Sequence, residues 1–465
     1  MKSKKNKVKN VLPQTIKISS LVTSNGFRIG FGKNKKYGVK YQSKIFSNLS
    51  LAQQKILADN FVYARTRQLT FLLESGLAYD FNKPLMADFA DYGINTDLGK
   101  IADLNNLSTK GLITAFKKAK ISFNKAKTKS YLVPKKANSA KQFILAMSFG
   151  KDSLLSYALA RELGLKCQLV FVKEMENLNS EEARHKNQII KEFTKQENLK
   201  LDYLYDNADE IFLAKELTKD IHEFDNTNGM LAFMLELLPL AYYHRAKYVI
   251  LGNEANFMDS FINHDGNLAY PSFDQSIVYA KKHNQHLAKF TKNNLQSVSL
   301  VEPIYNLAEM YLLYHRYPDL LKFVMSCSPE KPDSERWCYD CPMCAKAFLY
   351  SVAVGGDPKS IKFTKDFFAQ EYQALYPLFA KEIKRAYEKP QAVRDEQLLA
   401  FLLAYQNGAQ GYLIDLFVKN YLKEAKKREK VLRAKFFGIH PSTTIPTEFK
   451  TKLLNIYKQE LKGLL

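Results

Sequence analysis

Short apolar runs alternate with amphipathic stretches between about residues 141 and 353. The run 143–147 (Phe-Ile-Leu-Ala-Met) is apolar throughout, which is typical of a strand buried on both faces of a sheet. The stretch after it has helical spacing and stops at Gly164. The alternation recurs and predicts strands at 168–172, 201–205 and 248–251 and helices at 180–197 and 231–245. This order predicts an α/β fold with a parallel sheet and helices on both faces.

The sequence on either side of this region has a different pattern. Residues 11–135 begin with strand-like runs and continue with a helical stretch at 51–74. The lysine-rich stretch 117–136 contains Pro134 and is predicted to be a linker. From about residue 356 the spacing is helical to the end. We therefore predict four parts: a basic tail (1–10), an N-terminal α+β region (11–135), a parallel-sheet domain (136–355) and a helical C-terminal region (356–465).

The formal net charge of the 465 residues is +22, which attracts nucleic acid, anionic lipid or phosphorylated ligands. Lysine is spread along the whole chain, however, so specific nucleic-acid binding is the less favoured interpretation. The densest basic stretch, 419–435, has the spacing of a solvated helix face. No apolar run is long enough to span a bilayer, and the five lysines of residues 1–10 precede no apolar core. We expect a cytoplasmic protein with no membrane span.

A phosphate-binding loop is predicted directly after the run 143–147. Six residues form it: Ser148, Phe149, Gly150, Lys151, Asp152 and Ser153. Gly150 allows the backbone to approach a ligand, and the N–H groups at a helix start attract anions. The serines add hydroxyl donors, Lys151 adds charge, and Asp152 can cap the helix or hold Mg2+. The spacing is not that of a Walker A loop, and the Gly-Lys pair at 32–33 is predicted to be a turn. The alternative is an ordinary strand-to-helix turn with a serine cap.

A metal site is predicted near residue 340. Four of the five cysteines fall within eighteen residues: Cys327, Cys338, Cys341 and Cys344. Four thiolates complete a tetrahedral Zn2+ site and leave no open position, so its role is structural. The alternative is a set of reduced core thiols. Cys167 lies within a predicted strand and is interpreted as a core residue.

Polar residues follow the predicted strand 248–251. Ligands of open α/β sheets bind outside the carboxyl ends of the strands, which is where Asn253 and Glu254 fall. Glu254 is a candidate Mg2+ ligand or catalytic base, and the alternative is a helix-capping role. His264, in a glycine-containing loop, is a candidate acid or base, and the alternative is a solvated loop histidine. Asp274 is a weaker candidate on the same grounds.

The loop at 148–153 resembles the S-x-G-x-D-S motif of the PP-loop ATP pyrophosphatase superfamily. The match covers both serines, Gly150 and Asp152, whereas Phe149 stands where many members carry a second glycine. The resemblance implies an adenine nucleotide alpha hydrolase-like domain with the loop at the end of its first strand. It also implies that ATP is cleaved to AMP and diphosphate and that a substrate is adenylated.

Two branches of this superfamily are similar to the chain beyond the loop. The 7-cyano-7-deazaguanine synthases carry a comparable late four-cysteine zinc site, but they usually have Lys before the Glu where this chain has Ala308 and Glu309. The ATP-dependent epimerases that act on UDP-N-acetylmuramoyl-L-alanyl-L-glutamate resemble the chain over roughly residues 140 to 405. The Trp-Cys-x-x-Cys-Pro-x-Cys run at 337–344 is the most specific part of that resemblance. Much less resemblance precedes residue 130.

Three functional hypotheses follow, and the first two expect ATP, Mg2+ and structural Zn2+. The leading one is adenylation of a small-molecule carboxylate, a UDP-linked muramyl peptide of peptidoglycan synthesis, followed by epimerisation of its L-glutamate. Lys151 and Asp152 then act at the phosphates, and Glu254 or His264 is the base. The second transfers AMP to a deazapurine precursor or a tRNA base, which the net charge mildly favours. The third is a non-catalytic, zinc-stabilised nucleotide- or RNA-binding protein.

Overall fold

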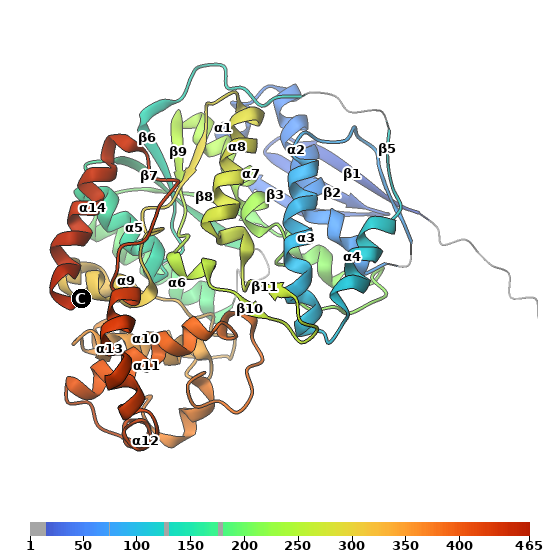
Figure 1. Cartoon of the computed structure of the whole chain (residues 1–465). Coiled ribbons are helices and arrows are strands. Elements are labelled where there is room, and N and C mark those ends of the chain that lie inside the picture. The colour runs from blue at the N-terminus through green and yellow to red at the C-terminus, as the bar shows by residue number, and fades with distance from the viewer. Residues whose placement is uncertain (1–14, 74, 125–129, 175–179) are drawn as a thin grey trace, which may run out of the picture.

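The computed structural model describes residues 15–73, 75–124, 130–174 and 180–465, so the predicted basic tail lies outside the described residues. A large sheet crosses the molecule, and helices cover both of its faces (Figure 1). Its strand order is β12-β9-β6-β7-β8-β3-β2-β1-β4-β5. Most neighbouring strands are parallel, which confirms the predicted α/β class.

The central part of the chain builds the parallel half of this sheet. Its strands are β6 (Ser139–Ala146), β7 (Lys166–Glu174), β8 (Leu201–Asp206), β9 (Ala246–Ile250) and β12 (Gln296–Val298). The first four confirm the strands predicted at 143–147, 168–172, 201–205 and 248–251. β6 has β7 and β8 on one side and β9 and β12 on the other. The chain therefore returns across β6 after β8, and this creates a topological switch point between β6 and β9.

The N-terminal strands continue the same sheet beyond β8. They are β3 (Asn34–Tyr41), β2 (Gly26–Phe31), β1 (Ile16–Thr23), β4 (Leu77–Tyr79) and β5 (Ile121–Phe123). β3 pairs antiparallel with β8, with Val39 opposite Asp206. The predicted turn at 32–33 joins β2 and β3. The segment predicted to be a linker, 117–136, contains the strand β5. This strand pairs with β4, and Phe123 stacks on Tyr79 of β4 at 5.2 Å, so this part of the segment belongs to the sheet.

Two hydrophobic cores lie on the two faces of the sheet. Phe143 and Leu145 of β6 belong to one core and Ile144 to the other, as the alternation of a strand requires. The first core contains α5 (Lys151–Glu162), α6 (Glu181–Gln196), α9 (Asn306–His315) and α14 (Thr447–Leu461). The second contains α1 (Ser43–Ser47), α2 (Leu51–Thr66), α3 (Ala87–Leu104), α4 (Thr109–Lys118), α7 (Gly229–Tyr243) and α8 (Ile277–Thr291). The helix predicted at 51–74 is shorter, because a 3-10 turn, η1 (Arg67–Phe71), follows α2.

Helices alone form the regular structure of residues 356–465, all of which are described. α11 (Gln391–Gln406), α12 (Tyr412–Asn420) and α13 (Leu422–Phe436) pack with α10 (Pro342–Ala353) in the lower part of Figure 1. The last helix, α14, returns to the sheet, where Tyr248 donates a 2.6 Å hydrogen bond to Glu448. A separate hairpin, β10 (Phe261–Ile262) and β11 (Leu268–Ala269), packs against α3.

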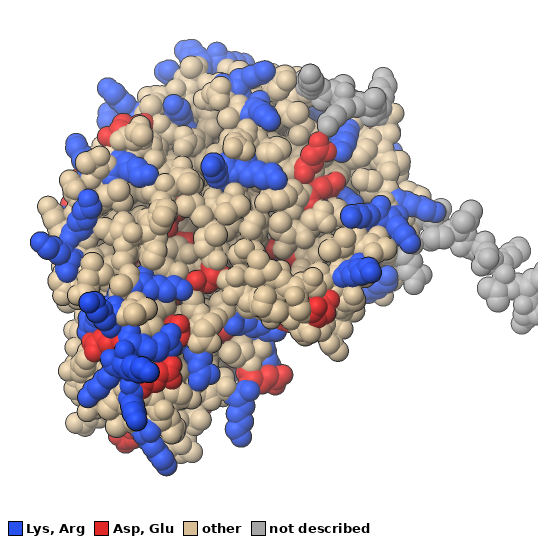
Figure 2. Space-filling model, in the orientation of Figure 1, with Lys and Arg blue, Asp and Glu red and all other residues tan. Residues whose placement is uncertain are grey.

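Basic side chains are spread over the surface. Figure 2 shows Lys and Arg around the edge of one face, with a gathering over the C-terminal helices. The stretch 419–435 spans the end of α12 and most of α13, and most of its lysines are exposed. In the described part of the chain, none of the helices combines the length and apolar character needed to cross a membrane.

Candidate active site and metal centre

The predicted phosphate loop joins the end of β6 to the start of α5. Gly150 immediately precedes α5, and its N–H donates to Ser148 Oγ at 3.3 Å. The hydroxyl of Ser153 donates to the Gly150 carbonyl at 3.1 Å and lies 3.2 Å from the hydroxyl of Ser148. Two serine hydroxyls therefore meet at the N-terminus of a 12-residue helix. This arrangement suits an anion, because the N–H groups of a helix start lack partners within the helix.

Phe149 gives the loop its sharp bend. Its φ of +64° lies in the left-handed region, which costs a non-glycine residue about 1 to 2 kcal/mol. The ring is fully buried. It packs edge-on against the ring of Phe193, with ring centroids 5.3 Å apart, and at a tilt against the ring of Phe171, with centroids 6.2 Å apart. Burial of an aromatic ring is worth more than this strain, so the loop keeps its shape without a glycine here.

The loop lies at the topological switch point of the sheet. It follows β6, and the segment Leu251–Asn253 follows the neighbouring strand β9. The two segments approach closely at Gly252, where an added Cβ would lie 2.9 Å from the Cβ of Asp152. Ligands of open α/β sheets bind in the crevice at this point.

A cavity of about 680 Å³ opens here. Its lining comes from the carboxyl ends of β6, β7, β8 and β9, the first two turns of α7, and neighbouring segments of α2 and α6. Ser148, Asp152 and Ser153 line it on the loop side. Small-molecule sites typically have volumes of about 300 to 1,000 Å³, so the cavity is large enough for a nucleotide.

Lys151 is not among the residues that line this cavity. Its side chain is buried, and its Nζ donates to Glu254 at 2.9 Å and to Glu309 at 3.1 Å and also contacts Asp152. Oxygen atoms of the three carboxylates lie within 4.8 Å of one another, so the group can hold a metal ion. We call Asp152, Glu254 and Glu309 the carboxylate triad. Glu309 was not selected from the sequence, although a lone glutamate within the apolar helix α9 is a signal for a buried polar role.

The pKa values of the triad diverge. Burial raises the pKa of Glu254 to about 8, and the neighbouring Asp152 acts in the same direction. Burial and the nearby Glu254 also raise the pKa of Glu309. Burial acts against ionisation of Asp152 too, but the Lys151 ammonium outweighs it and holds the Asp152 pKa below its usual range. Lys151 and Asp152 therefore form the ionised pair, and burial disfavours the charged forms of the two glutamates.

Lys186 is a second buried lysine, and it does line the cavity. Its ammonium donates to the carbonyl of Met325 at 2.9 Å and to the carbonyl of Ser148. Burial lowers its pKa to about 8. Sequence analysis missed this residue, although its spacing from Ile189, Ile190 and Phe193 places it on the apolar face of α6.

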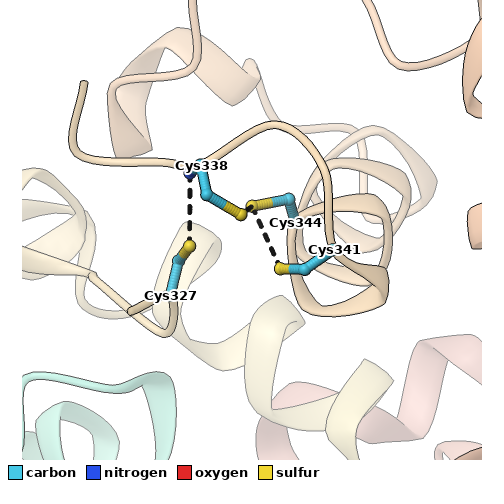
Figure 3. Close-up of side chains that lie close together, drawn as sticks. All are labelled: Cys327, Cys338, Cys341 and Cys344. Carbon is cyan, nitrogen blue, oxygen red and sulfur yellow. Dashed lines mark hydrogen bonds between the residues drawn. The ribbon is translucent and has the colours of Figure 1, made fainter. Parts of the chain in front are cut away.

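The four predicted cysteines lie together. Figure 3 shows Cys327 from one segment and Cys338, Cys341 and Cys344 from another, with their side chains pointing toward one another. The four Sγ atoms lie within 4.8 Å of one another, and Cys344 Sγ is 3.6 Å from that of Cys341 and 3.7 Å from that of Cys338. Tetrahedral Zn2+ with bonds of about 2.3 Å separates its sulfur ligands by about 3.8 Å. The cluster can therefore hold a metal ion such as zinc. Cys167 lies apart, and burial raises its pKa to about 12.

The remaining predicted residues are distributed over several places. Asn253 lines the cavity and donates to the carbonyl of Gln275 at 3.0 Å. His264 is exposed on the β10–β11 hairpin, where its main-chain N–H donates to Asp103 Oδ1 at 2.8 Å, and it does not line the cavity. Asp274 is buried and accepts the N–H of Met230 at the start of α7. The structure thus joins Glu254 to Lys151 and Asp152 but leaves His264 on a separate hairpin.

No family model and no curated protein matches this chain. Fold and site together define an α/β protein with an anion-suited loop, a nucleotide-sized cavity at a switch point and a four-cysteine cluster that can hold a metal ion.

Proposed function

We propose that this protein is an ATP pyrophosphatase of the PP-loop superfamily, which cleaves ATP to AMP and diphosphate and adenylates a substrate. The observation that carries the proposal is the meeting of the Ser148 and Ser153 hydroxyls at the N-terminus of α5, on the wall of the cavity. Its position at the switch point of the sheet supports a nucleotide as the ligand. The S-x-G-x-D-S resemblance supports the choice of ATP cleavage over simple nucleotide binding.

The loop acts on the β and γ phosphates in this proposal. The two hydroxyls, the helix N-terminus and the ammonium of Lys186 stabilise their negative charge. An acceptor oxygen attacks the α-phosphorus, and the bond from this phosphorus to the bridging oxygen breaks. Diphosphate leaves on the loop, where the same groups stabilise the charge that develops.

Mg2+ fits the carboxylate triad. Oε2 of Glu254 and Oε1 of Glu309 are buried and receive no hydrogen bond from the described residues, and oxygen is the ligand that Mg2+ prefers. Asp152 belongs both to the triad and to the cavity wall, which brings such an ion beside the phosphates. A bound Mg2+ would neutralise phosphate charge there, and it would take the place of the Lys151 ammonium, which now contacts all three carboxylates.

Zn2+ fits the four-cysteine cluster by chemistry and by spacing. Four thiolates leave no open coordination position, so the ion stabilises the segments that hold Cys327 and Cys338–Cys344 and takes no part in the reaction.

For the acceptor, the resemblance to the epimerases supports a carboxylate, UDP-N-acetylmuramoyl-L-alanyl-L-glutamate. Adenylation makes the C–H bond beside the activated carboxyl group more acidic. A base removes this proton, protonation on the opposite face inverts the centre, and hydrolysis releases AMP and the free carboxylate.

The test is incubation of purified protein with ATP, Mg2+ and this acceptor, with nucleotides separated by chromatography. We expect AMP and diphosphate in equal amounts, and a loss of about 100-fold in Asp152→Asn. Asp415→Asn, on the surface of α12, is the matched control. Formation of ADP, or no turnover above background, contradicts the proposal.

A further inference from the structure

The cavity has a second group of charged side chains on the wall formed by β8 and α7. Asp206 comes from the end of β8, Glu236 from α7 and Arg65 from α2. Glu236 is only 2% exposed and Arg65 only 4%, yet all three residues line the cavity. Arg65 also pairs with Asp209 at the rim. The loop and these residues therefore line the same cavity.

The carboxyl group of Glu236 has one oxygen without a hydrogen-bond partner among the described residues. Its Oε2 atom is buried and accepts no hydrogen bond from the described residues. It interacts with the carboxyl group of Asp206, whose Oδ1 accepts the N–H of Ala208 at 2.7 Å. Two carboxyl groups can bond to each other only through a shared proton, so the pair holds a proton that it can transfer.

Asp206 and Glu236 differ in the charges that surround them. Burial raises the pKa of Glu236 well above its usual value, and the charge of Asp206 adds to this effect. Burial raises the pKa of Asp206 as well, but the Arg65 guanidinium opposes that shift. The charges of Glu174, Glu210 and Asp225 also act on Arg65, Asp206 or Glu236. The Arg65 guanidinium therefore favours the negative charge on Asp206, and burial favours the proton on Glu236.

We propose that Asp206 and Glu236 form the acid–base pair that moves the α-proton of the adenylated acceptor. The inference rests on the proposed function. An acyl-adenylate formed at the loop occupies the cavity that this pair lines, whereas Glu254 and His264, the bases expected from the sequence, do not line it. A carboxyl pair that shares one proton can remove a proton at one atom of a substrate and supply one at another.

Two proton transfers form the enol of the acceptor, and two more return it to the acyl-adenylate. The Asp206 carboxylate takes the proton from the α-carbon, and the electron pair of the C–H bond forms the carbon–carbon double bond of an enol. The acyl oxygen takes the proton of Glu236. In the return step the enol gives this proton back to Glu236, and water protonates the α-carbon on the opposite face. The hydroxide formed takes the proton from Asp206, which restores the pair.

The experiment measures the incorporation of deuterium from solvent at the α-carbon of the acceptor. The protein is incubated in D2O with ATP, Mg2+ and UDP-N-acetylmuramoyl-L-alanyl-L-glutamate, and AMP release and deuterium at the α-carbon are measured separately. The Glu236→Gln variant keeps the shape of the side chain but lacks the acid. We expect it to form AMP while deuterium incorporation falls by about 100-fold or more. Glu192→Gln, an exposed carboxyl on α6, is the control.

The outcomes separate this inference from the proposed function. Exchange at the wild-type rate in Glu236→Gln contradicts the inference, and so does wild-type protein that releases AMP without incorporating deuterium. Wild-type protein that releases no AMP contradicts the proposed function and this inference with it. If Glu236→Gln does not fold, Asp206→Asn gives the same measurement, with the same loss of exchange expected.

Discussion

The main-chain N–H of Met325 donates a 2.8 Å hydrogen bond to the carbonyl oxygen of Phe149. The next residue, Ser326, accepts the N–H of Lys151 at 3.4 Å across 175 positions of sequence. Cys327, the first cysteine of the metal centre, follows immediately. The segment that begins the four-cysteine cluster therefore also holds one side of the loop 148–153, and the two motifs form one structural unit.

Removal of the metal should consequently impair the loop. Chelation, or Cys341→Ser, is expected to lower the melting temperature and to reduce ATP cleavage by about tenfold or more, because Met325 and Ser326 lose their anchor. Metal content, thermal unfolding and AMP release are measured on the same samples. Cys167→Ser, outside the cluster, should leave the metal content unchanged. Full turnover by folded, metal-free protein would contradict the coupling.

At Phe149, substitution by glycine should cost less stability than substitution by alanine. Loss of its ring is expected to cost about 3 to 5 kcal/mol of unfolding free energy in Phe149→Ala. Phe149→Gly should be more stable than Phe149→Ala by roughly 1 kcal/mol, because glycine adopts the positive φ without strain. Urea unfolding measures both values.

Phe193 provides the matched control for that order. It packs against the same ring but lies within α6, where glycine is worse than alanine by about 1 kcal/mol. Phe193→Gly should therefore be less stable than Phe193→Ala. The same order at both positions would show that backbone strain at Phe149 is unimportant.

Local patterns predicted the parts of this site that are close in sequence. The strand β6, the loop at 148–153 and the C-x-x-C spacing all depend on neighbouring residues, and the structure contains each of them. Partners distant in sequence were not predictable from these patterns. Glu309 lies 158 positions from the Lys151 that it contacts, and nothing local shows that the lysine side chain turns away from the cavity. The pairing of β3 with β8, which extends the sheet into the N-terminal region, is equally non-local.

Lys186 should contribute in two ways that its variants can separate. Lys186→Met removes both the charge at the cavity wall and the hydrogen bonds to the Ser148 and Met325 carbonyls. We expect a fall in kcat/KM for ATP of about 100-fold, since the loop loses its cation and one of its ties. Lys186→Arg keeps the charge and should recover part of this loss, mainly in KM. Lys195→Met, an exposed lysine of the same helix, is the control, and equal activity of Lys186→Met and wild type would exclude both roles.

Glu254 should make stability depend on pH in a defined direction. Its pKa rises from 4.5 to about 8 on folding, so the folded protein holds a proton that the unfolded chain releases. This contribution is fully present below about pH 4.5 and is lost as the pH rises through about 8, with a slope of at most about 1.4 kcal/mol per pH unit. Unfolding free energies measured by urea between about pH 5.5 and 8.5 should therefore fall, and Glu254→Gln should make this slope shallower by up to about 1.4 kcal/mol per pH unit because its amide does not titrate. Mg2+ should also flatten the profile, since a cation in the triad favours the ionised carboxylate.

Glu192→Gln is the control for this prediction. The carboxyl group of Glu192 is in solvent, so this variant should keep the wild-type slope. An unchanged slope in Glu254→Gln would mean that Glu254 is already ionised beside Lys151.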